Sequence, residues 1–195
     1  MQSLFKKKIY KSISKIFKTN NIPFWIDDLT LVYVLSNKHN YNSKINSLRL
    51  SIYSENFNQI IVLLKRLNSS FRYYYIPDKS GREWIDNKNC RIVCLRRWRN
   101  KTNAFKIYIT PKYRVGEYFH WVDKRSCKLS PRKYYMDLKV VYKFSQELPV
   151  PNYVQEYLEY RFGLNWINSP SYWIEGIKDN AIISPNQLKD VPVKE

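Results

Sequence analysis

The sequence is short of cysteine, of histidine and of long apolar runs, and each shortage excludes a class of protein. Three cysteines in 195 residues are too few, and odd in number, for a disulfide framework. Two histidines leave no zinc-ligand spacing. No apolar run approaches the ~20 residues that a membrane span needs, and no secretory signal opens the chain. We therefore expect an intracellular protein with reduced thiols and no transmembrane segment.

Acidic residues are also scarce. The chain carries 34 Lys and Arg against 16 Asp and Glu, for a formal net charge of +18. A positive field of that strength attracts phosphates, anionic membranes and acidic proteins, so we expect an anionic partner. Lys, Asn, Ile and Tyr are all abundant, as in an A/T-rich coding sequence. Such a coding bias would produce the same excess of charge without any partner, and this alternative stays open.

The chain does have enough apolar material for a core. It is 44% hydrophobic and 16% aromatic, which argues against a disordered chain. The length suits one domain, and no Pro- or Ser-rich linker divides it. We predict a single domain over residues 1–183. Residues 184–195 are polar with two prolines and are expected to form a loosely ordered tail.

Residues 1–19 form a basic amphipathic pattern. Apolar side chains that include Ile13 and Phe17 share one helical face, and six lysines surround that face. The pattern predicts the first helix of the domain, packed by its apolar stripe. A helix of this kind also contacts membrane surfaces or directs a protein to an organelle, and both alternatives stay open.

The rest of the chain alternates between strand and helix patterns, which predicts an α+β protein. Ser54 is expected to cap the helix at 55–68, and Asn152 the helix at 152–162, with Gln155 at the capping-box position and Gly163 ending that helix. Residues 116–131 are predicted to be irregular. The remaining predicted elements are strands at 23–26, 48–52, 71–76, 91–95, 104–109 and 138–144 and a short helix at 29–35.

Two segments near opposite ends of the chain resemble one known family. Lys18–Leu31 reads KTNNIPFWIDDLTL and is similar to the N-I-P-Y-W-L-D-G-G-T-L-L-G opening of the LicD/fukutin family. Glu147–Gly163, followed by Asn165, Trp166 and Pro170, is similar to the Y-L-x-x-x-Y-G-x-x-W-x-x-P close of that family. The resemblance implies a nucleotidyltransferase-like mixed sheet flanked by helices. It also implies transfer of phosphorylated groups from a nucleotide-linked donor onto a glycan.

The metal-binding aspartates of that family are replaced in this chain. Mg²⁺ needs carboxylates that face one point, and acids at i and i+2 on a strand provide them. The resemblance places this pair at Ser47 and Arg49, and the third carboxylate of the family at Tyr108. Arg49 would put a fixed cation where a metal should bind. We therefore expect no cofactor and no catalytic residue, with Mg²⁺ required only if activity is retained.

The family's phosphate-facing Gly-Gly-Thr is altered as well. Asp28 and Leu29 stand at the two glycine positions, Thr30 is kept, and Asp27 matches a position that is often acidic. The resemblance thus implies a substrate-binding set of Asp27, Asp28, Thr30 and Arg49. Two further interpretations stay open: Asp27 and Asp28 cap the following helix, and Arg49 binds a phosphate or pairs with a nearby acid such as Asp27.

Two functions follow from these observations. The first is a divergent LicD-like phosphotransferase that acts on a nucleotide-linked donor and a glycan. The second is a catalytically inactive basic module for binding or structure, in an assembly that contains RNA. A cluster of cations around an aromatic ring is typical of single-strand binding. The predicted nucleic-acid residues are Arg96, Arg97, Trp98, Arg99 and Lys101.

Overall fold

The computed structural model describes residues 2–36, 47–66, 71–77, 91–97, 106–123, 126–143, 145–167 and 179–183. The predicted tail at 184–195 therefore lies outside the described residues. The helices are α1 (Gln2–Thr19), α2 (Asp28–Leu35), α3 (Phe57–Arg66) and α4 (Val154–Phe162), with 3-10 turns at Ser54–Asn56 and Arg132–Tyr134. The strands are β1 (Phe24–Ile26), β2 (Ser47–Tyr53), β3 (Phe71–Pro77), β4 (Arg91–Arg97), β5 (Lys106–Val115), β6 (Tyr118–Asp123), β7 (Ser126–Pro131), β8 (Lys139–Lys143), β9 (Gln146–Val150) and β10 (Ile182–Ile183).

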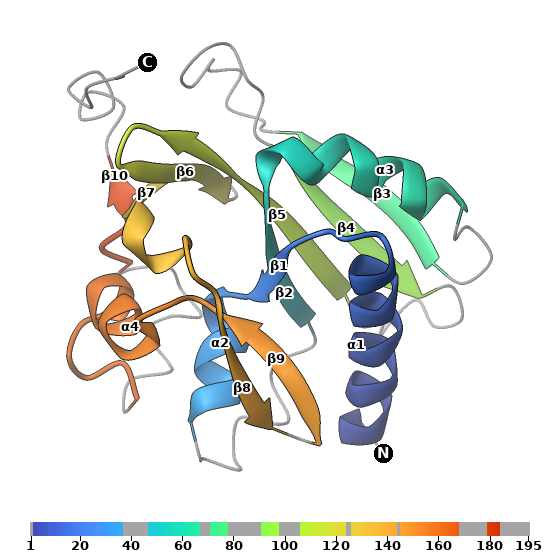
Figure 1. The fold of residues 1–195 in the computed structure, drawn as a ribbon, viewed down its shortest axis with the longest axis horizontal. Coiled ribbons are helices and arrows are strands. Elements are labelled where there is room, and N and C mark those ends of the chain that lie inside the picture. The colour runs from blue at the N-terminus through green and yellow to red at the C-terminus, as the bar shows by residue number, and fades with distance from the viewer. Residues whose placement is uncertain are drawn as a thin grey trace.

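Eight of the described strands form one mixed sheet. Its main path runs β1-β2-β5-β6-β7-β10, and the β3–β4 pair joins at β5. β2 and β5 are parallel, whereas the other pairs are antiparallel. β8 and β9 form a separate two-stranded sheet. In Figure 1, α1 and α3 lie beside the β3–β4 end of the large sheet, and α4 lies beside β7 and β10. The predicted α+β architecture, with a mixed sheet flanked by helices, is confirmed.

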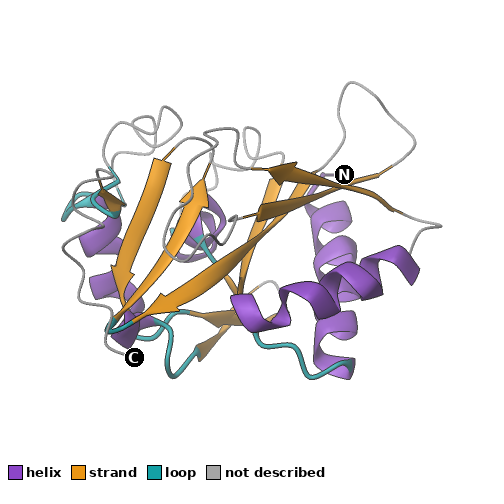
Figure 2. Ribbon diagram, turned by 90° about the horizontal axis from the view of Figure 1, so that it is seen from above, coloured by secondary structure: helices purple, strands orange, loops and turns teal. Residues whose placement is uncertain are grey.

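The strand β5 organises the sheet because it pairs along both edges. Its first seven residues pair with β2 and its first four also pair with β4, whereas its last three residues pair with β6. Figure 2 shows the long strands side by side with the helices packed around them. Leu48, Leu50 and Ile52 of β2 point into the core, so Ser47, Arg49 and Ser51 share the opposite face. This second face of β2 carries the candidate site.

Helix α1 packs as the predicted first helix of the domain. Tyr10, Ile13 and Phe17 are buried in the main core, and the Phe17 ring meets Phe24 edge-on at 5.2 Å between centroids. Burial of such a side chain contributes about 1.5–3 kcal/mol. Among the described helices, none combines the length and apolar character that crossing a bilayer requires. The membrane-surface and targeting roles of residues 1–19 stay predictions.

The prediction that residues 116–131 are irregular was wrong, because this segment contains the hairpin of β6 and β7. Gly116 has a φ of 53° in the two-residue turn that joins β5 to β6, a conformation that suits glycine. β6 carries Phe119, Trp121 and Val122 in the core, so both of its faces hold buried side chains. A strand that is apolar on both faces lacks the alternation by which sequence analysis finds strands.

Two predicted helix caps were also wrong in detail. The helix predicted at 55–68 corresponds to α3 (Phe57–Arg66), which follows the 3-10 turn at Ser54–Asn56, and no side-chain cap bond is made at Tyr53 before that turn. Helix α4 begins at Val154 with Tyr153 as its N-cap in the left-handed region, φ 47°. The Asn152 side chain instead accepts a bond from the Tyr153 N–H, 2.9 Å, and the Gln155 side chain bonds Glu159 within the helix.

Gly163 ends α4 as predicted. Its φ is +81°, and its N–H donates to the carbonyl of Glu159 at 2.8 Å. A Cβ added here would meet no atom within 4 Å, so backbone conformation alone disfavours other residues. We expect both Gly163→Ala and Gly163→Asn to lower the free energy of unfolding by about 1–3 kcal/mol, because a φ of 81° with a ψ of 169° is a conformation essentially confined to glycine. Urea denaturation measures both; equal stability of Gly163→Ala and the wild type would contradict this account.

Candidate functional site

The candidate site is built around Asp27, the residue between β1 and α2. Its backbone N–H donates to the carbonyl of Arg49 on β2 at 3.2 Å. Asp27 is the N-cap of α2, and its Oδ1 accepts from the N–H of Asp28 at 2.7 Å. The prediction that Asp27 caps this helix is therefore confirmed. The cap leaves the carboxylate buried beneath the sheet face of β2 and β5, with 3% of the residue exposed.

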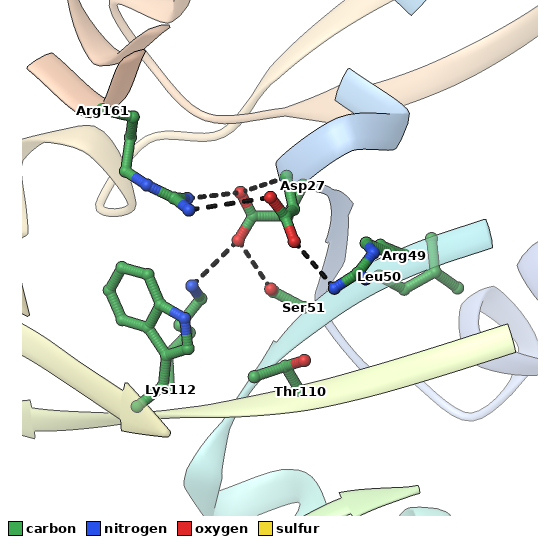
Figure 3. A pocket seen from close by; sticks show the side chains of 9 residues that line it. Asp27, Arg49, Leu50, Ser51, Thr110, Lys112 and Arg161 are labelled. Carbon is green, nitrogen blue, oxygen red and sulfur yellow. Dashed lines mark hydrogen bonds and ion pairs between the residues drawn. The ribbon is translucent and has the colours of Figure 1, made fainter. Parts of the chain in front are cut away.

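Both carboxylate oxygens of Asp27 are fully engaged. Oδ2 accepts from the Ser51 hydroxyl at 2.7 Å and lies 2.9 Å from the Lys112 ammonium. Oδ1 accepts from the Tyr157 hydroxyl, and the Arg161 guanidinium lies 3.7 Å away. Figure 3 shows Lys112 and Arg161 approaching the carboxylate from different elements. One acid therefore connects β2, β5 and α4 to the start of α2.

Asp28 is held in an unusual backbone conformation at the mouth of the site. Its φ of 55° lies in the left-handed region, which a residue with a Cβ seldom adopts. Its Oδ2 lies 2.8 Å from Nη1 of Arg49, and its Oδ1 lies 3.7 Å from Nη2 of Arg161. The side chains of Asp28 and Arg49 are each 19% exposed. This ion pair is therefore half-buried and closes the outer side of the site.

Arg161 joins the site to a second buried acid. Its guanidinium binds both carboxylate oxygens of Asp179, with Nε donating to Oδ1 at 2.6 Å, and Lys128 lies 2.9 Å from the same carboxylate. The Tyr157 hydroxyl accepts from Nη1 of Arg161 at 2.7 Å. The Lys112 ammonium lies 3.1 Å from the centroid of the Trp121 ring, a favourable place for a cation. Four cations and three acids thus form one network.

The pKa values reflect this network. Burial opposes ionisation of Asp27, but Lys112, Arg161 and the Tyr157 hydrogen bond outweigh it and hold the pKa of the carboxyl well below its ordinary range. Burial lowers the pKa of Lys112 to about 8 in spite of the neighbouring Asp27 carboxylate. Asp179 is also desolvated, yet Arg161 and Lys128 keep its pKa well below the ordinary value. At neutral pH the acids and cations therefore face one another as ions.

The residues present do not fit a divalent metal. Mg²⁺ requires several oxygen ligands that converge with free lone pairs. Both oxygens of Asp27 already have partners, and those of Asp28 face Arg49 and Arg161. In the part of the chain that the structure describes, no group of three or more His, Cys, Asp or Glu side chains could hold a metal ion. Here the carboxylates are neutralised by cations of the same chain.

The structure brings together part of the predicted site. Asp27, Asp28 and Arg49 line one small pocket, and the Thr30 hydroxyl accepts from the Arg49 N–H beside it at 2.9 Å. Arg49 pairs with an acid, as one interpretation proposed, but the acid is Asp28. Ser47 and Tyr108 are not among the residues that line the pocket.

Tyr108 is nevertheless close to Arg49 across the sheet. The two residues are register partners on β2 and β5, and the Arg49 guanidinium carbon lies 5.1 Å from the centroid of the Tyr108 ring. The predicted neighbourhood of strands is therefore present. The pocket lies farther along both strands than Ser47 and Tyr108, at Ser51 and its partner Thr110.

Sequence analysis missed six residues that line the pocket with Asp27, Asp28 and Arg49. Ser51 lies two positions after Arg49, and Thr110 and Lys112 lie two and four positions after Tyr108. Because alternate residues of a strand share a face, the predicted strands could have placed these three residues on the same face as Arg49 and Tyr108. Nothing in the sequence marked the buried partners from distant elements. The missed residues are Leu50, Ser51, Thr110, Lys112, Trp121 and Arg161.

The predicted nucleic-acid residues fall largely beyond what the structure describes. Arg96 and Arg97 are the last residues of β4. Trp98, Arg99 and Lys101 lie outside the described residues. The predicted single-strand interface at this segment therefore stays a prediction.

Comparisons with known proteins find similar chains among solved structures. No family model and no curated protein matches the sequence. Among solved structures, the chain is similar to the solution structure of the antibiotic-resistance factor ANT(2'')-Ia, at 11% identity and a TM-score of 0.45. The match covers 98% of this chain and 90% of that chain. Similarity at that TM-score is loose, so nothing about the chemistry of this chain follows from it.

The buried pair of Asp27 and Lys112 should be sensitive to loss of one partner. We expect Lys112→Met to lower the free energy of unfolding by about 3–5 kcal/mol, because it leaves a buried carboxylate with one close cation fewer. The double variant Asp27→Asn with Lys112→Met should recover part of that loss. Urea denaturation of Lys112→Met, of Asp27→Asn and of the double variant gives the coupling energy. Additive effects of the two substitutions would contradict a direct pair.

The depressed pKa of Asp27 predicts acid sensitivity. A carboxyl whose pKa is lower in the folded than in the unfolded state contributes stability above its unfolded pKa of about 3.9. That contribution is lost as the pH falls from about 4 toward the folded pKa. The stability difference between the wild type and Asp27→Asn should therefore narrow between about pH 5 and pH 2. A difference that stays constant over this window, measured by urea denaturation, would argue against a depressed pKa.

Proposed function

We propose that this chain is a nucleotidyltransferase-fold protein of the LicD/fukutin type in which an internal ion-pair network has replaced the metal site. In this proposal the protein is not a metal-dependent transferase and acts as a basic binding module. The observation that carries it is the double pairing of Asp27 with Lys112 and of Asp28 with Arg49, at 2.9 and 2.8 Å.

The backbone at Asp28 supports descent from a transferase site. Asp28 stands where the resembled family has the first glycine of Gly-Gly-Thr, and its φ of 55° is a conformation that glycine adopts without strain. A left-handed aspartate carries a steric penalty of about 1–2 kcal/mol relative to glycine. The retained conformation is expected if the glycine was replaced while the surrounding loop stayed in place. Thr30, the third residue of that motif, still bonds β2.

The pocket supports a revised placement of the lost acids. Carboxylates at i and i+2 would share the outer face of β2, and the two residues of that face that line the pocket are Arg49 and Ser51. Thr110 is the register partner of Ser51 on β5. We infer that these three positions correspond to the acidic positions of an active site. A guanidinium and two hydroxyls cannot hold Mg²⁺ as three carboxylates do.

The lost chemistry follows from these substitutions. Phosphoryl-type transfer depends on positioning the donor and on neutralising charge that develops on phosphate oxygens. Lys112 and Arg161 are 1% exposed and already bound to acids of the chain. They are therefore engaged inside the protein and do not reach a donor in solution. A divergent LicD-like phosphotransferase, the competing function, would have to release one of these cations to bind its substrate.

Isothermal titration calorimetry tests the proposal directly. We expect the wild-type protein to bind neither Mg²⁺ nor Mn²⁺, with or without CDP-linked donors, because both acids are occupied. Stoichiometric binding of metal together with a donor would instead establish the competing phosphotransferase.

One substitution should create the metal binding that the wild-type protein is expected to lack. Arg49→Asp removes the cation that neutralises Asp28 and adds a carboxylate beside it, so this variant should gain measurable Mn²⁺ binding. Arg114→Asp, which makes the same charge change at an exposed position of β5, should gain none. Equal Mn²⁺ binding by the wild type and by Arg49→Asp would contradict the replacement of the metal by Arg49.

A further inference from the structure

The outer flank of α1 carries lysines that no described acid fully balances. Lys11, Lys15 and Lys18 follow one another at spacings of four and three residues, so they lie along one side of the helix. The α1 sequence contains no acidic residue. Lys11 and Lys15 are exposed, and neither forms an ion pair within the residues that the structure describes. Like charges at these spacings repel one another, and a bound polyanion would remove that repulsion.

This flank adjoins the small sheet of β8 and β9. The Lys18 ammonium lies 3.1 Å from the Glu147 carboxylate, and the Tyr10 hydroxyl donates to the Glu147 carbonyl at 3.0 Å. Glu147 is the antiparallel register partner of Tyr142 on β8. Partners in an antiparallel pair point to the same face, so Tyr142 lies next to the acid that Lys18 contacts.

The neighbouring face of β8 exposes apolar and aromatic side chains. Tyr142 is 76% exposed, and Val140, two residues earlier on the same face, is 62% exposed. A tyrosine ring so open to solvent makes little contribution to the core. We call the surface formed by Lys11, Lys15, Lys18, Val140 and Tyr142 the α1–β8 face. Glu147 lies within it and is already paired to Lys18.

We propose that the α1–β8 face binds single-stranded nucleic acid, with the lysines along the phosphate backbone and a base stacked on Tyr142. Cations that follow a backbone beside an exposed aromatic ring are the elements of single-strand recognition. Lys11 and Lys18 are separated by about 10 Å along the helix at 1.5 Å per residue, enough to contact successive phosphates. The inference rests on the proposed binding-module function and names its partner and surface.

The same face is a poor match to a membrane. An interfacial helix binds a bilayer by inserting its apolar side, but Tyr10, Ile13 and Phe17 of α1 are at most 6% exposed because they pack in the core. The lysines alone would give only electrostatic contact, which leaves the exposed Tyr142 unexplained. A single strand of nucleic acid accounts for both features.

Fluorescence anisotropy with labelled oligouridylate and oligothymidylate tests the proposal on the full chain. We expect binding at low salt that weakens steeply as salt rises. Lys11→Gln with Lys15→Gln should reduce the slope of log affinity against log salt by about 1.4, at about 0.7 for each lost contact to a single strand. Tyr142→Ala should weaken binding about five-fold or more and leave the slope unchanged. The oligonucleotide with the higher affinity identifies RNA or DNA as the partner.

The control is Arg114→Gln, which removes one exposed positive charge of β5 outside the α1–β8 face. It should leave the salt slope unchanged. The proposal is overturned if the wild type binds neither oligonucleotide at low salt or binds polyglutamate in their place. It is also overturned if Arg114→Gln lowers the slope by about 0.7, the amount expected for each of the two lysines, or if Tyr142→Ala has no effect. None of these outcomes bears on metal binding, so the proposed function would be judged separately.

Discussion

The buried carboxylate of Asp27 is the interaction on which the surrounding structure depends. It caps the start of α2. It accepts hydrogen bonds from the hydroxyls of Ser51 on β2 and Tyr157 on α4, and it forms an ion pair with Lys112 on β5. These elements are distant in the sequence, and the ion pairs of Asp28 with Arg49 and Arg161 connect α2 to β2 and α4 a second time. An isolated buried charge would be strongly unfavourable, so the position of Asp27 requires its partners to be in place together. The network therefore specifies how α4 and the sheet are arranged around the first turn of α2.

In the proposed function, the same ion pairs limit the chemistry of the site. A lysine or arginine neutralises a carboxylate, as a metal ion does, but it offers no open coordination position for a substrate oxygen. It is also tethered to the chain and does not exchange with solvent. Under the proposed function, the pairing with Arg49 and Lys112 gives Asp28 and Asp27 a structural role. The lysines of α1 that are not part of this network lie on the surface, near the exposed ring of Tyr142.

Sequence patterns predicted the parts of the fold that depend on local periodicity. α1 and α3 followed from their apolar stripes and the end of α4 from Gly163, because spacing and backbone freedom are properties of a short segment. The hairpin of β6 and β7 was missed because β6 is buried on both faces. At the site, Asp27 and Arg49 were found through resemblance to a family. Lys112 and Arg161 were not found, because Lys and Arg are mostly exposed and the sequence does not show which of them is buried. Their burial depends on carboxylates that only the folded chain brings close to them.

Paramagnetic broadening of backbone amide signals by Mn²⁺ tests the central claim most directly, since a bound Mn²⁺ ion broadens nearby signals in nuclear magnetic resonance spectra. If Lys112 and Arg49 have replaced the metal, low concentrations of Mn²⁺ will leave the amides of Asp27, Asp28 and Arg49 no broader than those of the buried core. Selective broadening of these three amides in the wild-type protein, reversed by excess Mg²⁺, would show that the acids still hold a divalent ion and would contradict the account.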